Sequence, residues 1–180
     1  MATRKDILIG LLVVLVIASA GVAWVAPWQG ERAPEVHFET LDGERFALDE
    51  LQGHPTIVAF WATTCTICVQ EIPHFKALYE ELYPEGLELI AVAMEYDPED
   101  QVRAMAKERE MPYRVVLDRD GSIARAFGDI RLTPTTFLIG PNGEILQQRL
   151  GMVDTDKMRE RLTGLLPGEQ VALFEDDRRG

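Results

Sequence analysis

A short run of apolar, β-forming residues, TIVAFW at residues 56–61, stands just before a segment whose apolar residues recur with helical spacing. A run of this kind is typical of a strand that is buried on both faces. The helical segment covers residues 65–82, and a second apolar run, LELIAVAM, follows at residues 87–94. A strand, a long crossover and a second strand favour a right-handed βαβ unit with parallel strands. The sequence therefore predicts an α/β domain built around this unit.

Turn and cap signals divide the rest of the chain into short elements. Asp42-Gly43 is a strong signal for a hairpin turn, and residues 140–143, GPNG, predict a second hairpin. Asp97 followed by Pro98 is typical of a helix N-terminus and predicts that the Asp97 side chain caps this helix. We expect strands at residues 36–38, 45–48, 114–117, 135–139 and 144–150, one helical turn at 49–51, and helices at 97–109, 122–127 and 154–166.

The composition limits the classes of partner. The 180 residues carry a formal net charge of −12, which argues against nucleic acid and against electrostatic docking on anionic lipid. Binding to either would need clustered Lys and Arg. The length suits a single domain, which we expect over residues 31–167, followed by a loose acidic tail at residues 168–180.

An uncharged apolar run of twenty residues occupies residues 7–26 and follows Arg4 and Lys5. As a helix it would span roughly 30 Å, the thickness of a bilayer core, and the positive charges before it predict that the N-terminus stays inside. We therefore expect residues 1–30 to form a transmembrane anchor. The alternative is a signal peptide that is cleaved after Ala20. Both interpretations place the domain outside the cytoplasmic membrane.

The chain has two cysteines, Cys65 and Cys68, and they stand where the long helix is predicted to begin. Unpaired N–H groups and the helix dipole stabilise an anion at such a position, and only the thiolate form of a cysteine attacks a disulfide. Cys68 lies one turn deeper on the same face, where it is placed to attack a mixed disulfide formed on Cys65. Thr63 or Thr64 is a natural cap for this helix. This context predicts redox chemistry at the pair.

Other uses of a cysteine pair fit this sequence less well. A haem attachment site needs His directly after the second Cys, and Val69 stands there. A zinc site needs four ligands, and the scattered His37, His54 and His74 provide no second pair at ligand spacing. A structural disulfide that closes so short a loop would remove little entropy from the unfolded chain. We therefore expect no metal and no cofactor besides a redox-active disulfide, and we expect His74 on the surface.

Two longer motifs resemble a known family. Residues 61–73, WATTCTICVQEIP, resemble the segment W-A-x-W-C-x-x-C-x-x-E-x-P of the TlpA/ResA group of thioredoxin-like proteins. Residues 132–137, LTPTTF, resemble the thioredoxin cis-proline loop. The resemblance covers about residues 33–166. It implies a thioredoxin-like three-layer α/β/α fold with a central mixed sheet, an N-terminal β-hairpin extension and a helical insertion.

The resemblance also implies roles for individual residues. Cys65 would be the attacking thiol and Cys68 the resolving thiol. Pro134 would be cis, would face the pair, and would hold substrate backbone beside Thr133. Trp61 would pack near the pair.

Glu71 matches an acidic residue that tunes the thiols in some relatives. It lies three residues after Cys68 on the same helix face, where it would raise the thiol pKa or relay the thiol proton. The alternative is an exposed glutamate that interacts with the helix dipole. The sequence departs from the family at Thr64, where an aromatic residue is usual, and at Ala59, where cytoplasmic thioredoxins carry a buried Asp.

The function implied by the resemblance is disulfide reduction in exported proteins of the bacterial cell envelope, for example apocytochrome c, with electrons from a membrane thiol donor. The direction of transfer stays open, so a thiol oxidant or isomerase is an alternative. A thiol peroxidase and an SCO-type copper chaperone are two further alternatives. The chaperone class has three residues between its cysteines and a distant His, whereas this chain has two residues there and no His after His74. A monomer suffices for every one of these functions.

Overall fold

A five-stranded mixed sheet forms the centre of the computed structural model, which describes residues 30–166. Its strands lie in the order β5-β4-β3-β6-β7, and a separate β1–β2 hairpin precedes them. Along the chain the elements are β1 (His37–Glu39), β2 (Arg45–Ala47), η1 (Leu48–Leu51), β3 (Thr56–Trp61), α2 (Thr66–Leu82), η2 (Tyr83–Glu85), β4 (Glu88–Ala93), α3 (Glu99–Glu108), β5 (Arg114–Leu117), α4 (Ser122–Ala126), β6 (Thr135–Ile139), β7 (Ile145–Leu150) and α5 (Thr155–Thr163).

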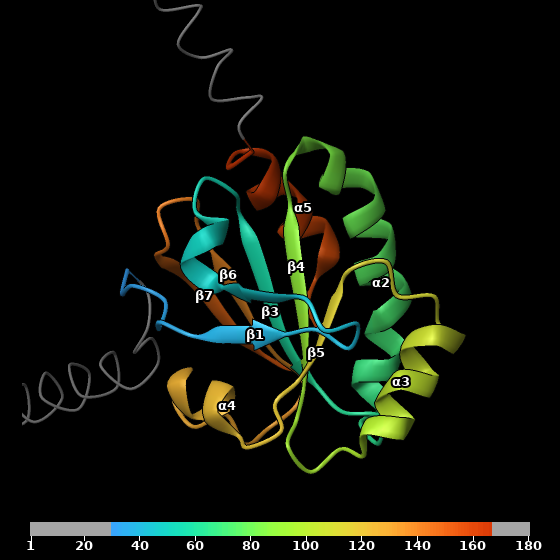
Figure 1. Cartoon of the computed structure of the whole chain (residues 1–180). Helices are drawn as coiled ribbons and strands as arrows, with labels where there is room; N and C mark the ends of the chain where they lie inside the picture. The colour runs from blue at the N-terminus through green and yellow to red at the C-terminus, as the bar shows by residue number, and fades with distance from the viewer. Residues whose placement is uncertain (1–29, 167–180) are drawn as a thin grey trace, which may run out of the picture.

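The predicted βαβ unit is confirmed. Strands β3 and β4 pair in parallel with Thr56 opposite Glu88, and α2 connects them. Strand β5 continues the parallel part, whereas β6 and β7 pair antiparallel. The carboxyl ends of β3, β4 and β5 therefore meet at one edge of the sheet, where their arrowheads point in the same direction (Figure 1).

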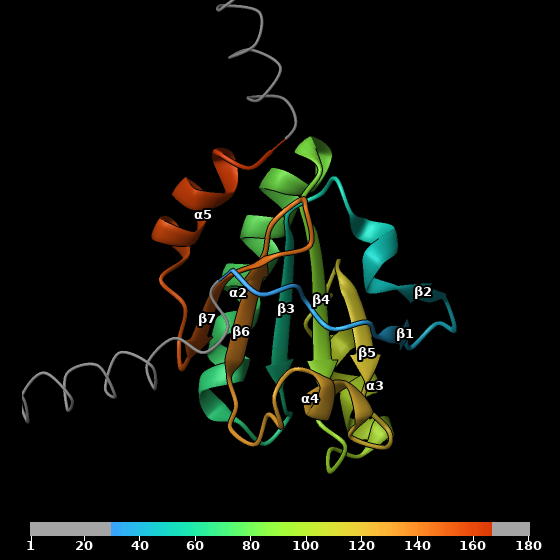
Figure 2. The same ribbon diagram turned by 90° about the vertical axis from the view of Figure 1, so that its left-hand side faces the viewer.

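Side chains of the central strands alternate between two hydrophobic cores, one on each face of the sheet. In β3, Ile57, Ala59 and Trp61 belong to the core that also contains buried residues of α2, α3 and α5. Val58 and Phe60 belong to the other core, with residues of the hairpin, η1 and α4. This burial on both faces explains why the whole strand is apolar. Figure 2 shows α5 and the hairpin on opposite sides of the molecule.

The expected hairpin extension is confirmed, and it covers the second face of the sheet. Phe38 pairs with Phe46 across the two strands, and Gly43 in the turn has a φ of +87°, which only glycine adopts without strain. Thr40 bridges to Val116 of the edge strand β5. The hairpin crosses in front of the sheet in Figure 1. The outer layer on this face thus contains the hairpin and short helices, so only part of it is helical.

Both predicted helix caps are wrong. Helix α3 has Pro98 at its N-cap without a side-chain cap bond, because the Asp97 carboxylate instead accepts hydrogen bonds from Thr63. Helix α2 is capped by Cys65, whose sulfur accepts a hydrogen bond from the backbone N–H of Cys68. The Cys65 cap is a local contact between residues three apart, whereas Asp97 and Thr63 meet because each follows one of the neighbouring strands β4 and β3.

Two predictions concern segments that the structure does not describe. The anchor at residues 1–30 lies outside the described residues except for Gly30, and the tail at residues 168–180 lies outside them entirely. Between residues 30 and 166, no helix has the length and apolar character needed to cross a bilayer.

Candidate active site

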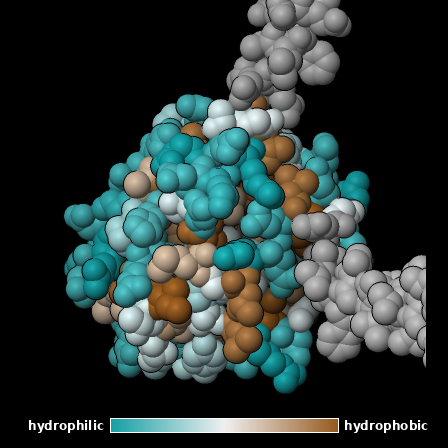
Figure 3. All heavy atoms as spheres, turned by 180° about the vertical axis from the view of Figure 1, so that it is seen from behind, coloured by the Kyte–Doolittle hydropathy of each residue, from teal (hydrophilic) through white to brown (hydrophobic). Residues whose placement is uncertain are grey.

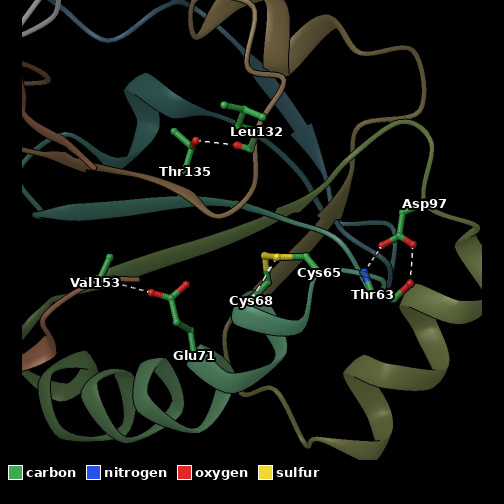
Figure 4. The surroundings of a disulfide bond; sticks show 8 residues. All are labelled: Thr63, Cys65, Cys68, Glu71, Asp97, Leu132, Thr135 and Val153. Atoms are coloured by element: carbon green, nitrogen blue, oxygen red, sulfur yellow. Dashed lines mark hydrogen bonds between the residues drawn. A yellow bond between two sulfur atoms is a disulfide. The ribbon is translucent and has the colours of Figure 1, made fainter. Parts of the chain in front are cut away.

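Cys65 is the N-cap of α2 and Cys68 lies in the first turn of this helix, at the carboxyl end of the parallel strands. Cys65 and Cys68 form a disulfide in this structure (Figure 4). Cys65 is half-buried, whereas the side chain of Cys68 is buried at 3% exposure. The outer sulfur is therefore the one that a partner molecule reaches first, as the predicted roles of attacking and resolving thiol require.

The start of α2 supplies a hydrogen-bond donor to the outer sulfur. The backbone N–H of Cys68 points at the Cys65 sulfur, with 3.2 Å between nitrogen and sulfur. A second backbone bond, from the N–H of Val69 to the carbonyl of Cys65, closes the first helical turn. In the reduced protein this donor and the helix dipole favour the thiolate form of Cys65. The pair thus has the electrostatics of a reactive thiol site.

The loop before β6 lies opposite the disulfide and contains a cis peptide bond between Thr133 and Pro134, as the resemblance implied. The hydroxyl of Thr135 donates to the carbonyl of Leu132 at 2.7 Å, and the N–H of Gly151 donates to the carbonyl of Pro134 at 2.9 Å. Figure 4 shows this loop across from the pair. These bonds fix the loop on both sides of the proline.

A cavity of about 20 Å³ lies directly behind the disulfide. Four of the six predicted site residues contribute to its wall, namely Trp61, Cys68, Glu71 and Pro134. Cys65 is joined to this group through the disulfide, and the half-buried Thr133 precedes Pro134 without lining the cavity. A cavity of this size has room for roughly one water molecule.

Glu71 is buried at 3% exposure, so the alternative of an exposed glutamate is wrong. Its carboxylate accepts a hydrogen bond from the backbone N–H of Val153 at 2.5 Å, and this contact brings the segment between β7 and α5 over the helix. Burial raises the pKa of Glu71 above its ordinary value, although the Val153 N–H and then the charge of His74 lower it in part. His74 itself is exposed, as predicted.

Several residues at the site were missed by sequence reasoning. Val153 and Tyr113 carry no local signal, because their contacts with the site arise from segments far apart in the chain. Burial and then the nearby Glu71 carboxylate raise the pKa of Tyr113, so its phenol stays protonated. Asp97 had a usable signal: it follows β4, and functional residues collect where parallel strands end.

Exposed apolar side chains stand on the segments that form the site. They are Ile67 between the cysteines, Leu132 before the cis-proline and Met152 beside Val153, with exposures of 45%, 62% and 42%. In the view from behind, hydrophilic residues cover most of the surface and hydrophobic residues appear as separate patches (Figure 3). The segments that form the site therefore carry three exposed apolar side chains on a chain whose composition is acidic.

Comparison with known proteins agrees with this geometry. Residues 29–148 match the AhpC/TSA family. The chain is 36% identical over 140 residues to the thiol-disulfide oxidoreductase ResA of Halalkalibacterium halodurans, and the match covers 78% of each protein. It is 29% identical over 173 residues to ResA of Bacillus subtilis, with 92% of this chain and 96% of that protein covered.

Among solved structures, a thiol:disulfide interchange protein of Chlorobium tepidum matches with a TM-score of 0.69 and 25% identity, covering 76% of this chain and 97% of that one. The fold, the cysteine pair at the start of α2 and the extent of these matches lead to one assignment. The chain belongs to the AhpC/TSA family of thioredoxin-fold proteins and is a ResA-like thiol–disulfide oxidoreductase.

Proposed function

We propose that this protein reduces disulfides in exported polypeptides, with apocytochrome c as one client, at the outer side of the cytoplasmic membrane. The observation that carries the proposal is the asymmetry of the pair: a half-buried Cys65 at the helix start and a buried Cys68 beside the buried Glu71. Such a pair suits transfer of two electrons from a dithiol to a bound disulfide.

The reaction proceeds in two exchanges. The Cys65 thiolate attacks one sulfur of the client disulfide, forms a mixed disulfide, and releases the other client sulfur as a thiolate that takes up a proton. The Cys68 thiolate then attacks the Cys65 sulfur, so that the intramolecular disulfide forms and the second client thiolate leaves. The client gains two electrons and the pair loses two. A membrane thiol donor returns them by the reverse chemistry.

Glu71 is proposed to take the proton from Cys68 before the second exchange. Both groups line the same cavity, and a single water between them would connect carboxylate and thiol. A raised carboxyl pKa suits this role, because general bases work best when their pKa is close to the ambient pH. Ala59 also lines the cavity and carries no carboxyl group, so Glu71 supplies the carboxyl group among the residues that line this cavity.

A polypeptide is the proposed substrate because the site presents both apolar and backbone contacts. Ile67, Leu132 and Met152 offer exposed apolar surface on the segments that form the site. We propose that Thr133 and Pro134 hold an extended client backbone against the pair and that Trp61 supports the wall of the cavity behind it. The chain is proposed to act as a monomer.

The N-terminal sequence supports the proposed location. We propose that the apolar run at residues 7–26 anchors the protein in the cytoplasmic membrane and that the domain acts on the outer side. Cleavage after Ala20 would release the same domain on the same side of the membrane.

The first test is the reduction potential of the Cys65–Cys68 pair in the folded protein, measured against a glutathione or dithiothreitol series. We expect a value near that of thioredoxin, about −270 mV. A value near that of DsbA, about −120 mV, would reverse the proposed direction of transfer and contradict the reductase function.

A second measurement tests the order of the exchanges. With an oxidised apocytochrome peptide as client, Cys65→Ser is expected to abolish reduction, because the accessible thiol is lost and the remaining Cys68 is buried. Cys68→Ser is expected to stop at a mixed disulfide between Cys65 and the client, visible by mass spectrometry. Reduction at the parental rate by Cys65→Ser would exclude the mechanism.

A further inference from the structure

Asp97 is a buried carboxylate that the exchange chemistry described above does not use. Its side chain is 4% exposed and lies in the loop between β4 and α3. One carboxylate oxygen accepts the backbone N–H of Thr63 at 2.6 Å, and the other accepts the Thr63 hydroxyl at 2.5 Å (Figure 4). Both oxygens of the group are therefore directed at one residue of the segment that carries the cysteines.

The position of Thr63 makes this contact relevant to the chemistry. Thr63 lies two residues before Cys65, inside a turn that is closed by the hydrogen bond from the Cys65 N–H to the Ala62 carbonyl at 3.1 Å. Asp97 holds that turn from outside, from the loop that follows β4, the strand next to β3 in the sheet. Charge-assisted bonds of this kind are about twice as strong as neutral ones. Without Asp97, the Thr63 N–H loses its partner.

We propose that Asp97 is a positioning residue, which holds the turn before Cys65 so that the Cys65 sulfur stays in reach of Cys68. The step that depends on it is the second exchange, in which the Cys68 thiolate forms a bond to the Cys65 sulfur and the client sulfur leaves as a thiolate. This step is intramolecular, and its equilibrium and rate depend on how well the two sulfurs are held together. A looser turn lowers the effective concentration of one cysteine at the other.

The effective concentration is measurable as the equilibrium constant for oxidation of the dithiol by oxidised glutathione. For Asp97→Ala we expect about a tenfold fall in this constant, which corresponds to a potential about 30 mV more positive for a two-electron couple. Asp97→Asn keeps the shape and an acceptor for the Thr63 N–H, so we expect a change of less than about threefold. In Asp97→Ala the mixed disulfide with an oxidised client peptide is also expected to accumulate. Acid quenching followed by mass spectrometry measures its amount.

Asp118 provides a matched control. It is 1% exposed, and its two oxygens accept the backbone N–H groups of Ile123 at 3.1 Å and Ala124 at 2.8 Å at the start of α4. It follows β5, two strands away from β3. Asp118→Ala is expected to lower the melting temperature, because two backbone N–H groups at the start of α4 lose their acceptor, and to leave the glutathione equilibrium unchanged.

Three outcomes would overturn the proposal. The first is an unchanged equilibrium in Asp97→Ala. The second is an equal change in Asp118→Ala, which would mean a general loss of stability. The third is an equal change in Asp97→Asn and Asp97→Ala, which would mean that the charge acts and not the clamp. If Asp97→Ala does not fold, the test passes to Thr63→Val, which removes one of the two bonds: about a threefold fall supports the proposal and no change contradicts it.

The inference rests on exchange at the cysteine pair and not on the proposed direction of transfer. Every value is compared with the parent protein under the same conditions. An oxidising parental potential would therefore contradict the proposed reductase function while the comparison between variants still tests Asp97.

Discussion

Glu71 is a carboxyl group that the fold places beside the Cys65–Cys68 disulfide and away from bulk solvent. The backbone N–H of Val153 gives it one strong hydrogen bond, which offsets part of the free energy lost on burial. The remaining penalty falls on the ionised form, because a charge in an apolar surrounding loses its hydration. The raised pKa of Glu71 is the result, and it links the stability of the protein to pH.

The substitution Glu71→Gln tests this link. Because the pKa of Glu71 is higher in the folded than in the unfolded chain, the parent loses stability as the pH rises from the unfolded value, about 4.3, through the folded value. Gln cannot ionise, so the free energy of unfolding of the variant is expected to rise relative to that of the parent across this window. Above the window the difference between the two free energies is expected to stay constant. Urea unfolding of the oxidised proteins between pH 4 and pH 8 measures the difference.

The matched control is Glu80→Gln, on the exposed side of the same helix. Two parallel stability curves for the parent and Glu71→Gln would contradict a raised pKa at Glu71. The same variant should slow the second exchange at neutral pH if Glu71 accepts the Cys68 proton.

Helix α2 has two tasks, since one end carries the reactive pair and one face fills the core. Its buried residues recur with helical spacing, as the sequence predicted: Cys68, Glu71, Ile72, Phe75, Leu78, Tyr79 and Leu82. The pair sits at its N-terminus, where the dipole acts, whereas the residues from Phe75 onward pack between the sheet and α5. Stability and reactivity are therefore expected to depend on different turns of one helix.

Leu78→Ala tests this separation. Leu78 is 0% exposed in the core shared with α5, so its truncation is expected to destabilise the protein by about 2–5 kcal/mol. The glutathione equilibrium of the cysteine pair is expected to stay at the parental value. Ala77→Ser on the exposed face serves as the control, with a change of less than about 0.5 kcal/mol in urea unfolding. A large shift of the redox equilibrium in Leu78→Ala would show that core and site are coupled.

At the scale of the whole molecule, an apolar N-terminal run precedes an acidic domain that carries the cysteine pair at one end of its sheet. The proposed envelope function requires that this run delivers the domain across the membrane. A C-terminal fusion of the full chain to alkaline phosphatase, which is active only outside the cytoplasm, measures this directly. We expect phosphatase activity in the membrane fraction.

Mass spectrometry of the same fusion separates the two interpretations of the N-terminus. An intact N-terminal segment supports the anchor, whereas a chain that starts at Gly21 supports the cleaved signal peptide. An inactive fusion in the cytoplasm would contradict both interpretations of the N-terminus and the proposed location outside the cytoplasm.

Much of the fold was predictable because its signals are local. Three signals are each contained in a short stretch of residues: the apolar run of β3, the turn at Asp42-Gly43 and the helical spacing of α2. The structure confirms all three. The cysteine pair was predictable for the same reason, since a strand before it and a helix after it are both visible in the sequence. Short-range sterics and hydrophobic periodicity are sufficient for these features.

The partners of Glu71 and Asp97 could not be predicted in this way. Glu71 is buried because the segment after β7 reaches α2, and Asp97 binds Thr63 because β4 lies next to β3 in the sheet. The order β5-β4-β3-β6-β7 results from packing both faces of the sheet at once, which no short stretch of residues encodes. The cysteine pair and its place at a helix start are thus determined by a few neighbouring residues. The contacts of Glu71 and Asp97 with the segments around the pair depend on long-range packing.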